Sequence, residues 1–226
     1  MKKLYKGSVL VISLLLLAVF GMDAGAEEIL VADDFNRPGN LCMGTMSDGA
    51  HGWFEMDRKE DDLVSGRGTT IFIGYRSGTN PVVGAAVYGF TLADGTVSVK
   101  VHWINTKVKG RGRAAGISYR ANTIEHACDA YSGKNAYHVR ITPDWTGKND
   151  IELVYWGTVL ATANISDKFA AFDLSVTFKQ NSHKVYVNGE LKIDYTETKA
   201  NRTGAGYIGL GLYSTAVHFD DFKVSK

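Results

Sequence analysis

Apolar and polar residues alternate along most of the chain after Ile29. Residues 97–103 place three Val and a Trp on one side and Ser, Lys and His on the other, and residues 172–179 repeat this arrangement with Phe, Leu, Val and Phe. A period of two is typical of a strand with one buried face. Further strands are predicted near 53–57, 63–66, 69–75, 82–90, 113–120, 136–141, 150–156, 158–165 and 206–213.

The turns between these segments indicate an all-β fold. Asn188-Gly189 separates residues 184–187 from residues 190–195, and Asn-Gly supplies the two positive φ angles of a type I′ hairpin turn. Helical patterns are confined to 123–130, interpreted as a loop with one helical turn, and to 166–171. Many short strands with turn residues between them favour a two-sheet antiparallel β-sandwich with jelly-roll connections.

Two aspartate pairs, Asp33-Asp34 and Asp220-Asp221, lie near opposite ends of the strand-rich region. By strict alternation, Val217 and Phe219 lie on one face of the last strand, whereas Phe222 lies on the opposite face. If these side chains are all buried, the last strand must contain a β-bulge at Asp220-Asp221. We therefore expect the first and last strands to lie side by side, with a bulge in the last one.

The first 26 residues have the pattern of a bacterial secretory leader. Three Lys precede an apolar run at 9–20, and Ala24-Gly25-Ala26 matches a small-residue cleavage site. The run is too short to span a bilayer comfortably, and no second apolar segment of membrane length follows it. We expect cleavage after Ala26, which leaves one domain of residues 27–226 that is secreted, periplasmic or held at the cell surface.

The balance of charges argues against nucleic acid as a partner. The whole chain has 25 Lys and Arg against 24 Asp and Glu, and removing the three Lys and one Asp of the leader leaves 22 against 23, a formal charge of −1. A nearly neutral domain without a basic stripe lacks the electrostatic footprint of nucleic-acid binding. The sequence leaves the oligomeric state open.

The expected mature chain keeps two cysteines, Cys42 and Cys128. Exported proteins seldom keep exposed free thiols, so we expect these two to form a disulfide. Closing so long a loop would stabilise the fold by a few kcal/mol on chain-entropy arguments. The alternative is two unpaired thiols in separate loops.

Several short motifs, taken in order, resemble successive strands of the concanavalin A-like jelly-roll superfamily. They are 33–37 (DDFNR), 116–120 (GISYR), 135–140 (NAYHVR), 185–189 (VYVNG), 206–210 (GYIGL) and 218–224 (HFDDFKV). The likeness is to the laminin-G-like and keto-disaccharide-hydrolase-like branches, and residues 41–50 look like an insertion relative to them. The resemblance implies a jelly roll that tends to bind glycans, but this fold hosts enzymes, lectins and adhesion modules alike.

The aspartate pairs are candidate calcium ligands. Calcium takes about six to eight oxygen ligands, and Asp33, Asp34, Asp220 and Asp221 would approach one another if the terminal strands pair. Jelly rolls of this resemblance often hold a structural calcium near the chain ends. The alternative is that Asp220 and Asp221 accept backbone N–H bonds in the bulge or face solvent.

Exposed aromatic residues are candidates for contact with a polysaccharide or glycan, because sugar rings present apolar faces to a flat partner. The candidates are Trp145, Tyr131, Tyr155 and Trp156. Trp145 lies in a turn-rich loop, and Tyr155-Trp156 precedes Gly157 at a predicted hairpin tip, where one of the two must face outward. The alternative for each is a place in the core.

The acids of a glycanase are not evident. Glycanases of this fold carry Glu-x-Asp-x-x-Glu on one strand, and the nearest match has only Asp150 and Glu152, without a third acid. Glycosidases need a pair of carboxylates at a defined separation. The cluster at 57–62 contains Asp57 and Glu60 but mixes both signs of charge, which is typical of a solvated loop. If the protein is an enzyme, these four acids are the candidates.

The sequence therefore predicts a secreted, non-catalytic carbohydrate-binding or adhesion β-sandwich, with structural Ca²⁺ as its only expected cofactor. The first alternative is a glycan-active hydrolase or lyase on the same fold. The second is a purely structural protein of the cell surface or envelope.

Overall fold

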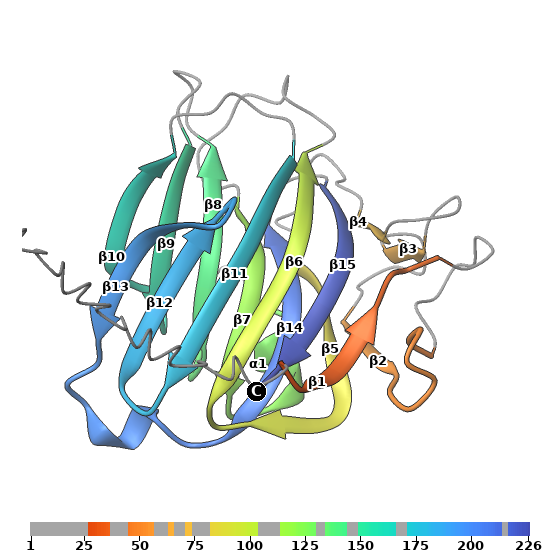
Figure 1. Ribbon diagram of the computed structural model, residues 1–226, viewed down its shortest axis with the longest axis horizontal. Helices are drawn as coiled ribbons and strands as arrows, with labels where there is room; N and C mark the ends of the chain where they lie inside the picture. Colours follow the sequence, from red (N-terminus) through yellow and green to blue (C-terminus); the bar gives the residue numbers. More distant parts are fainter. Residues whose placement is uncertain are drawn as a thin grey trace, which may run out of the picture.

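Two antiparallel sheets stack face to face (Figure 1). The computed structural model describes residues 27–36, 45–56, 63–65, 71–73, 82–103, 114–129, 134–143, 149–165, 171–213 and 217–226. The predicted leader, residues 1–26, lies outside the described residues. Within the described ranges, no helix is long and apolar enough to cross a membrane.

The first sheet runs in the order β13-β12-β11-β6-β15-β4-β3, and β1 pairs along β15 as well. Its strands are β1 (Ile29–Asp33), β3 (Leu63–Ser65), β4 (Ile71–Ile73), β6 (Gly95–Trp103), β11 (Ala171–Lys179), β12 (Ser182–Val187), β13 (Glu190–Thr196) and β15 (Val217–Ser225). All of its pairings are antiparallel.

The second sheet runs in the order β10-β9-β8-β7-β14-β5-β2 and is also antiparallel throughout. Its strands are β2 (Trp53–Met56), β5 (Val82–Leu92), β7 (Ala114–Ala121), β8 (Tyr137–Pro143), β9 (Asn149–Tyr155), β10 (Thr158–Ile165) and β14 (Gly206–Tyr213). The two-sheet antiparallel sandwich predicted from the alternation of apolar residues is confirmed.

The hairpin between β12 and β13 also has the predicted form. Asn188 and Gly189 have φ angles of 52° and 78°, which are the two positive values that a type I′ turn requires. Val187 then pairs with Glu190 across the turn.

The first and last strands meet, as the two aspartate pairs suggested. Asp33 of β1 lies opposite Phe222 of β15. Between β15 and β6 the register shifts between Asp220 and Lys223, and Asp221 has a φ of 50°. Phe219 and Phe222 are consequently both fully buried, although they are three residues apart. The predicted bulge is confirmed, and it lets β15 pack both phenylalanines into one core.

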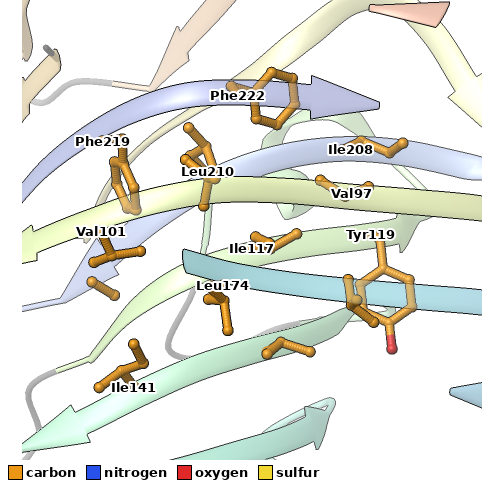
Figure 2. Packing of buried hydrophobic residues seen from close by; sticks show 14 of the residues in the cluster. Val97, Val101, Ile117, Tyr119, Ile141, Leu174, Ile208, Leu210, Phe219 and Phe222 are labelled. Carbon is orange, nitrogen blue, oxygen red and sulfur yellow. The ribbon is translucent and has the colours of Figure 1, made fainter. Parts of the chain in front are cut away.

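Side chains from the two sheets fill the space between them (Figure 2). Figure 2 shows Val97 and Leu174 of the first sheet beside Ile117 and Ile141 of the second. These side chains are all fully buried. The alternation of apolar residues in β6 and β11 thus corresponds to the face that each strand turns toward the core.

The segment after β7 folds back over the outer face of the second sheet. It contains the short helix α1 (Ile124–Ala127), whose N-cap Thr123 accepts a hydrogen bond from the backbone N–H of His126. A Cβ added to Gly209 would lie 2.6 Å from the carbonyl oxygen of Ala127, and one added to Gly84 would lie 2.1 Å from that of Cys128. Glycine is therefore required on the outer face of the strands that α1 covers.

Candidate functional site

A pocket of about 300 Å³ opens at one end of the second sheet, where β7 and β9 finish and β8 and β14 start. Its size is at the lower end of the usual range for ligand sites. The lining residues are Arg120, Asn122, Asn135, Tyr155, Asn201, Arg202, Gly204 and Ala205. We call it the arginine pocket. Its segments are far apart in the chain, but they meet because β9, β8, β7 and β14 are consecutive in the sheet.

Arg120 is held rigidly in this lining. Its φ of 50° breaks the alternation at the end of β7, and its side chain is only 1% exposed. Nε donates to the carbonyl oxygen of Ala93 at 2.8 Å, Nη2 donates to Asp94 Oδ1 at 3.1 Å, and Cζ lies 5.1 Å from the ring centroid of Phe178. Burial lowers the pKa of Arg120 from its ordinary value. Nη1 is buried and has no hydrogen-bond partner.

Arg202 is fixed on Tyr155. It ends the 3-10 turn η1 (Ala200–Arg202), and its Cζ lies 3.8 Å from the ring centroid of Tyr155. Nη1 donates to Glu197 Oε2 at 3.1 Å. A cation over an aromatic face is attracted by the electron-rich ring. The contact with the ring and the ion pair together hold the guanidinium against one wall of the arginine pocket.

Glu197 anchors this arrangement from within the fold, since its side chain is 1% exposed. Oε2 accepts hydrogen bonds from Arg202 and from the hydroxyl of Tyr137 at 2.8 Å, and Oε1 accepts one from the backbone N–H of Lys199 at 2.9 Å. Burial alone would raise the pKa of Glu197, but these hydrogen bonds outweigh it and lower the pKa. The carboxylate therefore stays ionised and both of its oxygens are occupied.

Two of the three asparagines of the pocket, Asn122 and Asn135, lie between β7 and β8, on either side of α1. Asn122 Oδ1 lies 2.5 Å from Nδ1 of His126, so the oxygen accepts from the imidazole and the amide NH₂ group is left as a donor. The backbone N–H of Asn122 donates to the carbonyl oxygen of Asn135 at 3.1 Å, and Asn135 has a φ of 51°. These contacts place both asparagines at the same edge of the sheet.

One of the predicted aromatic residues lines this pocket, and another is the next residue along the chain. Tyr155 lines it, and Trp156 follows in the turn between β9 and β10 with 55% of its surface exposed. The φ angles of Trp156 and Gly157, 47° and 70°, form the tight turn that points the indole away from the strand. The other two predicted aromatic residues, Tyr131 and Trp145, lie outside the described residues.

A buried polar cluster lies next to the pocket residues. The hydroxyl of Tyr119 and Nδ1 of His183 are 2.8 Å apart, and the rings of Tyr119 and Tyr137 stack with centroids 5.3 Å apart. Burial, helped by the charge of Arg120, lowers the pKa of His183 to about 4. His183 is therefore neutral at physiological pH, and its Nε2 is buried without a partner.

A second buried histidine pairs with a serine, but no substrate can reach them. Ser118 Oγ lies 2.8 Å from Nδ1 of His138, which resembles a nucleophile and its base. Both residues are fully buried, and burial lowers the pKa of His138 to about 3. We assign this pair to the packing of the sheet.

The predicted acids Asp150 and Glu152 lie on β9 but outside the arginine pocket. Glu152 Oε2 accepts from Nε of Arg140 at 2.8 Å, and Asp150 Oδ1 accepts from Asn164 at 3.1 Å. Both acids alternate with the core residue Ile151 and so face outward. The other two candidates, Asp57 and Glu60, lie outside the described residues.

The four predicted calcium ligands are placed in separate environments. Asp33 is buried and accepts from Trp53 Nε1 at 2.6 Å and from the backbone N–H of Phe35 at 2.9 Å. Asp221 Oδ2 pairs with Lys100 Nζ at 2.5 Å. Among the described residues, no group of three or more His, Cys, Asp or Glu is arranged to hold a metal ion. The calcium site stays a prediction.

The remaining two aspartates serve the backbone locally. Asp34 Oδ1 accepts from the N–H of Asn36 at 3.0 Å, and Asp220 Oδ1 accepts from the N–H of Asp221 at 2.8 Å. Burial raises the pKa of Asp220. The alternative interpretation of Asp220, as an acceptor within the bulge, therefore describes what is observed.

Cys128 is a free, buried thiol, so the predicted disulfide with Cys42 is not seen. The residue caps α1, and its Sγ approaches the carbonyl oxygens of Ile124 at 3.5 Å and Phe54 at 3.9 Å. Burial raises the pKa of the thiol to about 12. Cys128 thus behaves as a small core residue beneath α1. Cys42 lies outside the described residues.

Sequence reasoning did not identify the two arginines of the pocket or Asn122 and Asn201. Arg120 and Asn135 lie in motifs that indicate the fold, and nothing in their spacing marks them as neighbours of Arg202. The only local signal is the polar cluster Asn201-Arg202-Thr203 just before β14.

No protein-family model matches the chain, and no curated protein matches it in sequence. Solved structures do resemble it. A carbohydrate-binding module, CBM66, from Bacillus subtilis aligns with a TM-score of 0.54 and 14% identity over 77% of this chain and 95% of that one. The endo-β-1,3-glucanase from Pyrococcus furiosus aligns with a TM-score of 0.63 and 11% identity over 88% and 94%. The β-glucanase from Bacillus licheniformis aligns with a TM-score of 0.58 and 13% identity over 90% and 99%.

Likeness at this level of identity establishes the fold and leaves the activity to be argued from the site. The closer likeness to the laminin-G-like and keto-disaccharide-hydrolase-like branches stays a prediction. The stacked antiparallel sheets, the paired terminal strands and the likeness to these structures show that the chain has a jelly-roll β-sandwich fold.

Proposed function

We propose that the protein is a secreted, non-catalytic carbohydrate-binding domain that holds a sugar in the arginine pocket. The observation that carries the proposal is the pocket itself, in which hydrogen-bonding side chains surround the Tyr155–Arg202 stack beside the exposed Trp156. A sugar presents hydroxyl groups around its edge and an apolar face, and this site offers partners for both. The carbohydrate ligands named for similar structures support the same class of ligand.

The composition of the pocket supports binding rather than cleavage. None of its described lining residues is Asp or Glu, whereas glycoside hydrolysis ordinarily uses a pair of carboxylates. The pocket side chains are also held by contacts with the fold, as in the Arg202–Glu197 pair. Preorganised donors lower the entropic cost of binding.

A glycan-active hydrolase is the second candidate. Asp150 and Glu152 share the outer face of β9, and several similar structures are glucanases. However, Glu152 is engaged by Arg140. The third candidate, a purely structural surface protein, requires that the arginine pocket bind no sugar.

The proposal is tested by measuring binding to a panel of plant, algal and bacterial polysaccharides by affinity gel electrophoresis, together with release of reducing ends. We expect retardation by at least one polysaccharide and no release of reducing ends. Trp156→Ala should weaken binding, because Trp156 is 55% exposed and directly follows the lining residue Tyr155. Tyr88→Ala should not, because neither Tyr88, which is 67% exposed, nor the residues next to it line the pocket. Repeating the assay with a chelator tests the predicted calcium ion separately.

Each outcome distinguishes the candidates. Release of reducing ends that is abolished in Glu152→Gln would establish the hydrolase instead. Absence of binding across the whole panel would leave the structural role. Binding that is equally sensitive to Tyr88→Ala and Trp156→Ala would place the ligand elsewhere on the surface.

A further inference from the structure

Resting on the proposed function, we infer that the sugar recognised by the arginine pocket carries an anionic group, a carboxylate or a sulfate, which Arg202 contacts directly. Three observations support the inference. They are the kinds of hydrogen-bonding groups in the pocket, the free edge of the Arg202 guanidinium and the buried charge of Arg120.

Arg202 presents a planar cation with unused donors. A guanidinium has five N–H groups, and the structure pairs Nη1 with Glu197 and places the plane on Tyr155. The side chain is 17% exposed, so part of it remains accessible from the pocket. A guanidinium fixed in this way is suited to two parallel hydrogen bonds to a carboxylate or sulfate.

Arg120 adds a positive charge that cannot move away. Its side chain is 1% exposed, is tied to Ala93 and Asp94, and retains a buried Nη1 without a partner. An unpaired donor on a buried cation is costly to leave unsatisfied. An anion in the pocket would offset part of this cost electrostatically, even without touching Nη1.

The two charged side chains of the pocket lining are arginines, which donate hydrogen bonds and accept none. Asn122 uses its side-chain oxygen on His126 and leaves its NH₂ group as the free end. Sugar hydroxyl groups need acceptors as well as donors, whereas a carboxylate or sulfate only accepts. The two guanidinium groups and the NH₂ group of Asn122 therefore suit an anionic substituent, while the amides of Asn135 and Asn201 can pair with the hydroxyl groups of the same sugar.

The carboxylates that pair with the two arginines also accept hydrogen bonds from other groups. Both oxygens of Glu197 are occupied by Tyr137, Lys199 and Arg202. Asp94 Oδ1 also accepts from the backbone N–H of Gln180 at 2.7 Å. Each arginine is already paired with one carboxylate. Recognition of an anion therefore depends more on the direction of the guanidinium N–H groups than on the net charge of the pocket. Binding should accordingly survive physiological salt.

The test compares matched acidic and neutral ligands at 150 mM NaCl. Polygalacturonate, alginate and hyaluronan are each paired with their carboxyl-reduced forms, and dextran sulfate is paired with dextran. We expect an acidic polymer to bind at least about tenfold more tightly than its neutral partner, as one charge-assisted bidentate contact would give. The two arms distinguish carboxylate from sulfate.

Variants locate the contact. Arg202→Gln should remove the preference for the acidic form, and Arg202→Lys should restore only part of it, because Lys is a point charge that cannot form the bidentate contact. Arg140→Gln is the matched control, since Arg140 pairs with Glu152 and does not line the pocket. Thermal melting of each variant shows whether the fold is retained, and the acidic-to-neutral ratio of the Lys variant remains informative if the Gln variant is unstable.

The failures of the two proposals differ. Equal binding of acidic and neutral forms, still weakened by Trp156→Ala, would overturn this inference and leave the carbohydrate-binding function in place. An acidic preference that Arg202→Lys and Arg202→Gln leave unchanged would also overturn it. Absence of binding to every polymer would overturn both.

Discussion

The guanidinium of Arg202 lies over the ring of Tyr155, with Cζ 3.8 Å from the ring centroid. This contact joins the turn before β14 to the end of β9, two segments separated by more than forty residues of chain. This contact fixes the side chain of Arg202 in the lining of the arginine pocket.

Replacing Tyr155 tests that contact. Tyr155→Leu removes the aromatic face while keeping an apolar side chain, and a cation–π contact is worth about 0.5–2 kcal/mol. We expect a loss of about threefold to tenfold in affinity for the bound polysaccharide, measured by isothermal titration calorimetry. Tyr155→Phe keeps the ring and should stay within about twofold of the wild type. If Phe binds as weakly as Leu, the hydroxyl group rather than the stack is what matters.

Removing Glu197 should destabilise the protein strongly. Glu197→Ala leaves Arg202 and the hydroxyl of Tyr137 without their shared partner, and breaking a buried charged pair costs about 3–5 kcal/mol. Denaturation in urea measures the change. Glu152→Ala is the control, because the Glu152 side chain is 19% exposed against 1% for Glu197, so its loss should cost about 1 kcal/mol or less. Equal losses in the two variants would show that the Glu197 cluster is not a structural anchor.

The stability of the protein should fall with mild acid. The ordinary pKa of a histidine is 6.5, whereas in the folded chain burial lowers the pKa of His183 to about 4 and that of His138 to about 3. At a pH between the folded and the unfolded pKa of a histidine, the unfolded chain binds more protons than the folded chain does. Lowering the pH in this range therefore favours unfolding.

The free energy of unfolding is therefore at its plateau above the ordinary histidine pKa. It should decrease as the pH falls through 6.5 toward 4, by at most about 1.4 kcal/mol per pH unit for each histidine. Urea denaturation at a series of pH values measures the slope. His183→Gln keeps a hydrogen-bond acceptor for the hydroxyl of Tyr119 but removes one titrating group. The slope of the unfolding free energy against pH should therefore lose the contribution of one histidine. A slope unchanged in that variant would contradict the assignment to His183.

Gly209 should be irreplaceable for a steric reason. A Cβ there would lie 2.6 Å from the carbonyl oxygens of Ala127 and Ala85, so Gly209→Ala must displace the segment that contains α1. We expect a loss of about 2–4 kcal/mol by urea denaturation, with weaker binding because Asn122 moves with that segment. Gly204→Ala is the matched control for stability alone, since a Cβ there meets no atom within 4 Å but Gly204 lines the pocket. Similar losses at both positions would point to chain flexibility rather than contact.

Counting thiols distinguishes the free cysteine from a disulfide. Cys128 is buried and the pKa of its thiol is raised to about 12, so a thiol reagent should not modify it in the folded protein. In denaturant without reductant, we expect both Cys42 and Cys128 to react. No reaction in denaturant would show that the two are bonded to each other in the purified protein.

The sandwich could be predicted because its causes are local. The alternation in β6 and β11, the Asn188-Gly189 turn and the phase change between Phe219 and Phe222 are each contained in a few consecutive residues. Each follows from the two-residue period of a strand or from the φ angles of a turn. The expectation that one of Tyr155 and Trp156 faces outward has the same local origin, and the structure shows that Trp156 is the exposed one.

The pocket could not be predicted because its causes are not local. Arg120 and Asn135 adopt positive φ angles that favour glycine, and these angles are imposed by tertiary contacts. The lining then depends on which strands are neighbours in the sheet and on the close approach that Gly84 and Gly209 permit. Cys128 illustrates the same limit, because its burial depends on where α1 lies, whereas the disulfide was inferred only from the expected compartment.

The pairing of β1 with β15 has a mechanical consequence. Glu28 and Lys226 exchange backbone hydrogen bonds of 3.3 and 3.0 Å at the open end of this pair, next to Ile29 and Ser225. Tension applied between the two ends of the folded domain would load these bonds one after another, as a zipper opens, rather than all together in shear. Tension between either end and a ligand held by β7 and β9 would instead pass through the interior of the sheets, where many hydrogen bonds share the load.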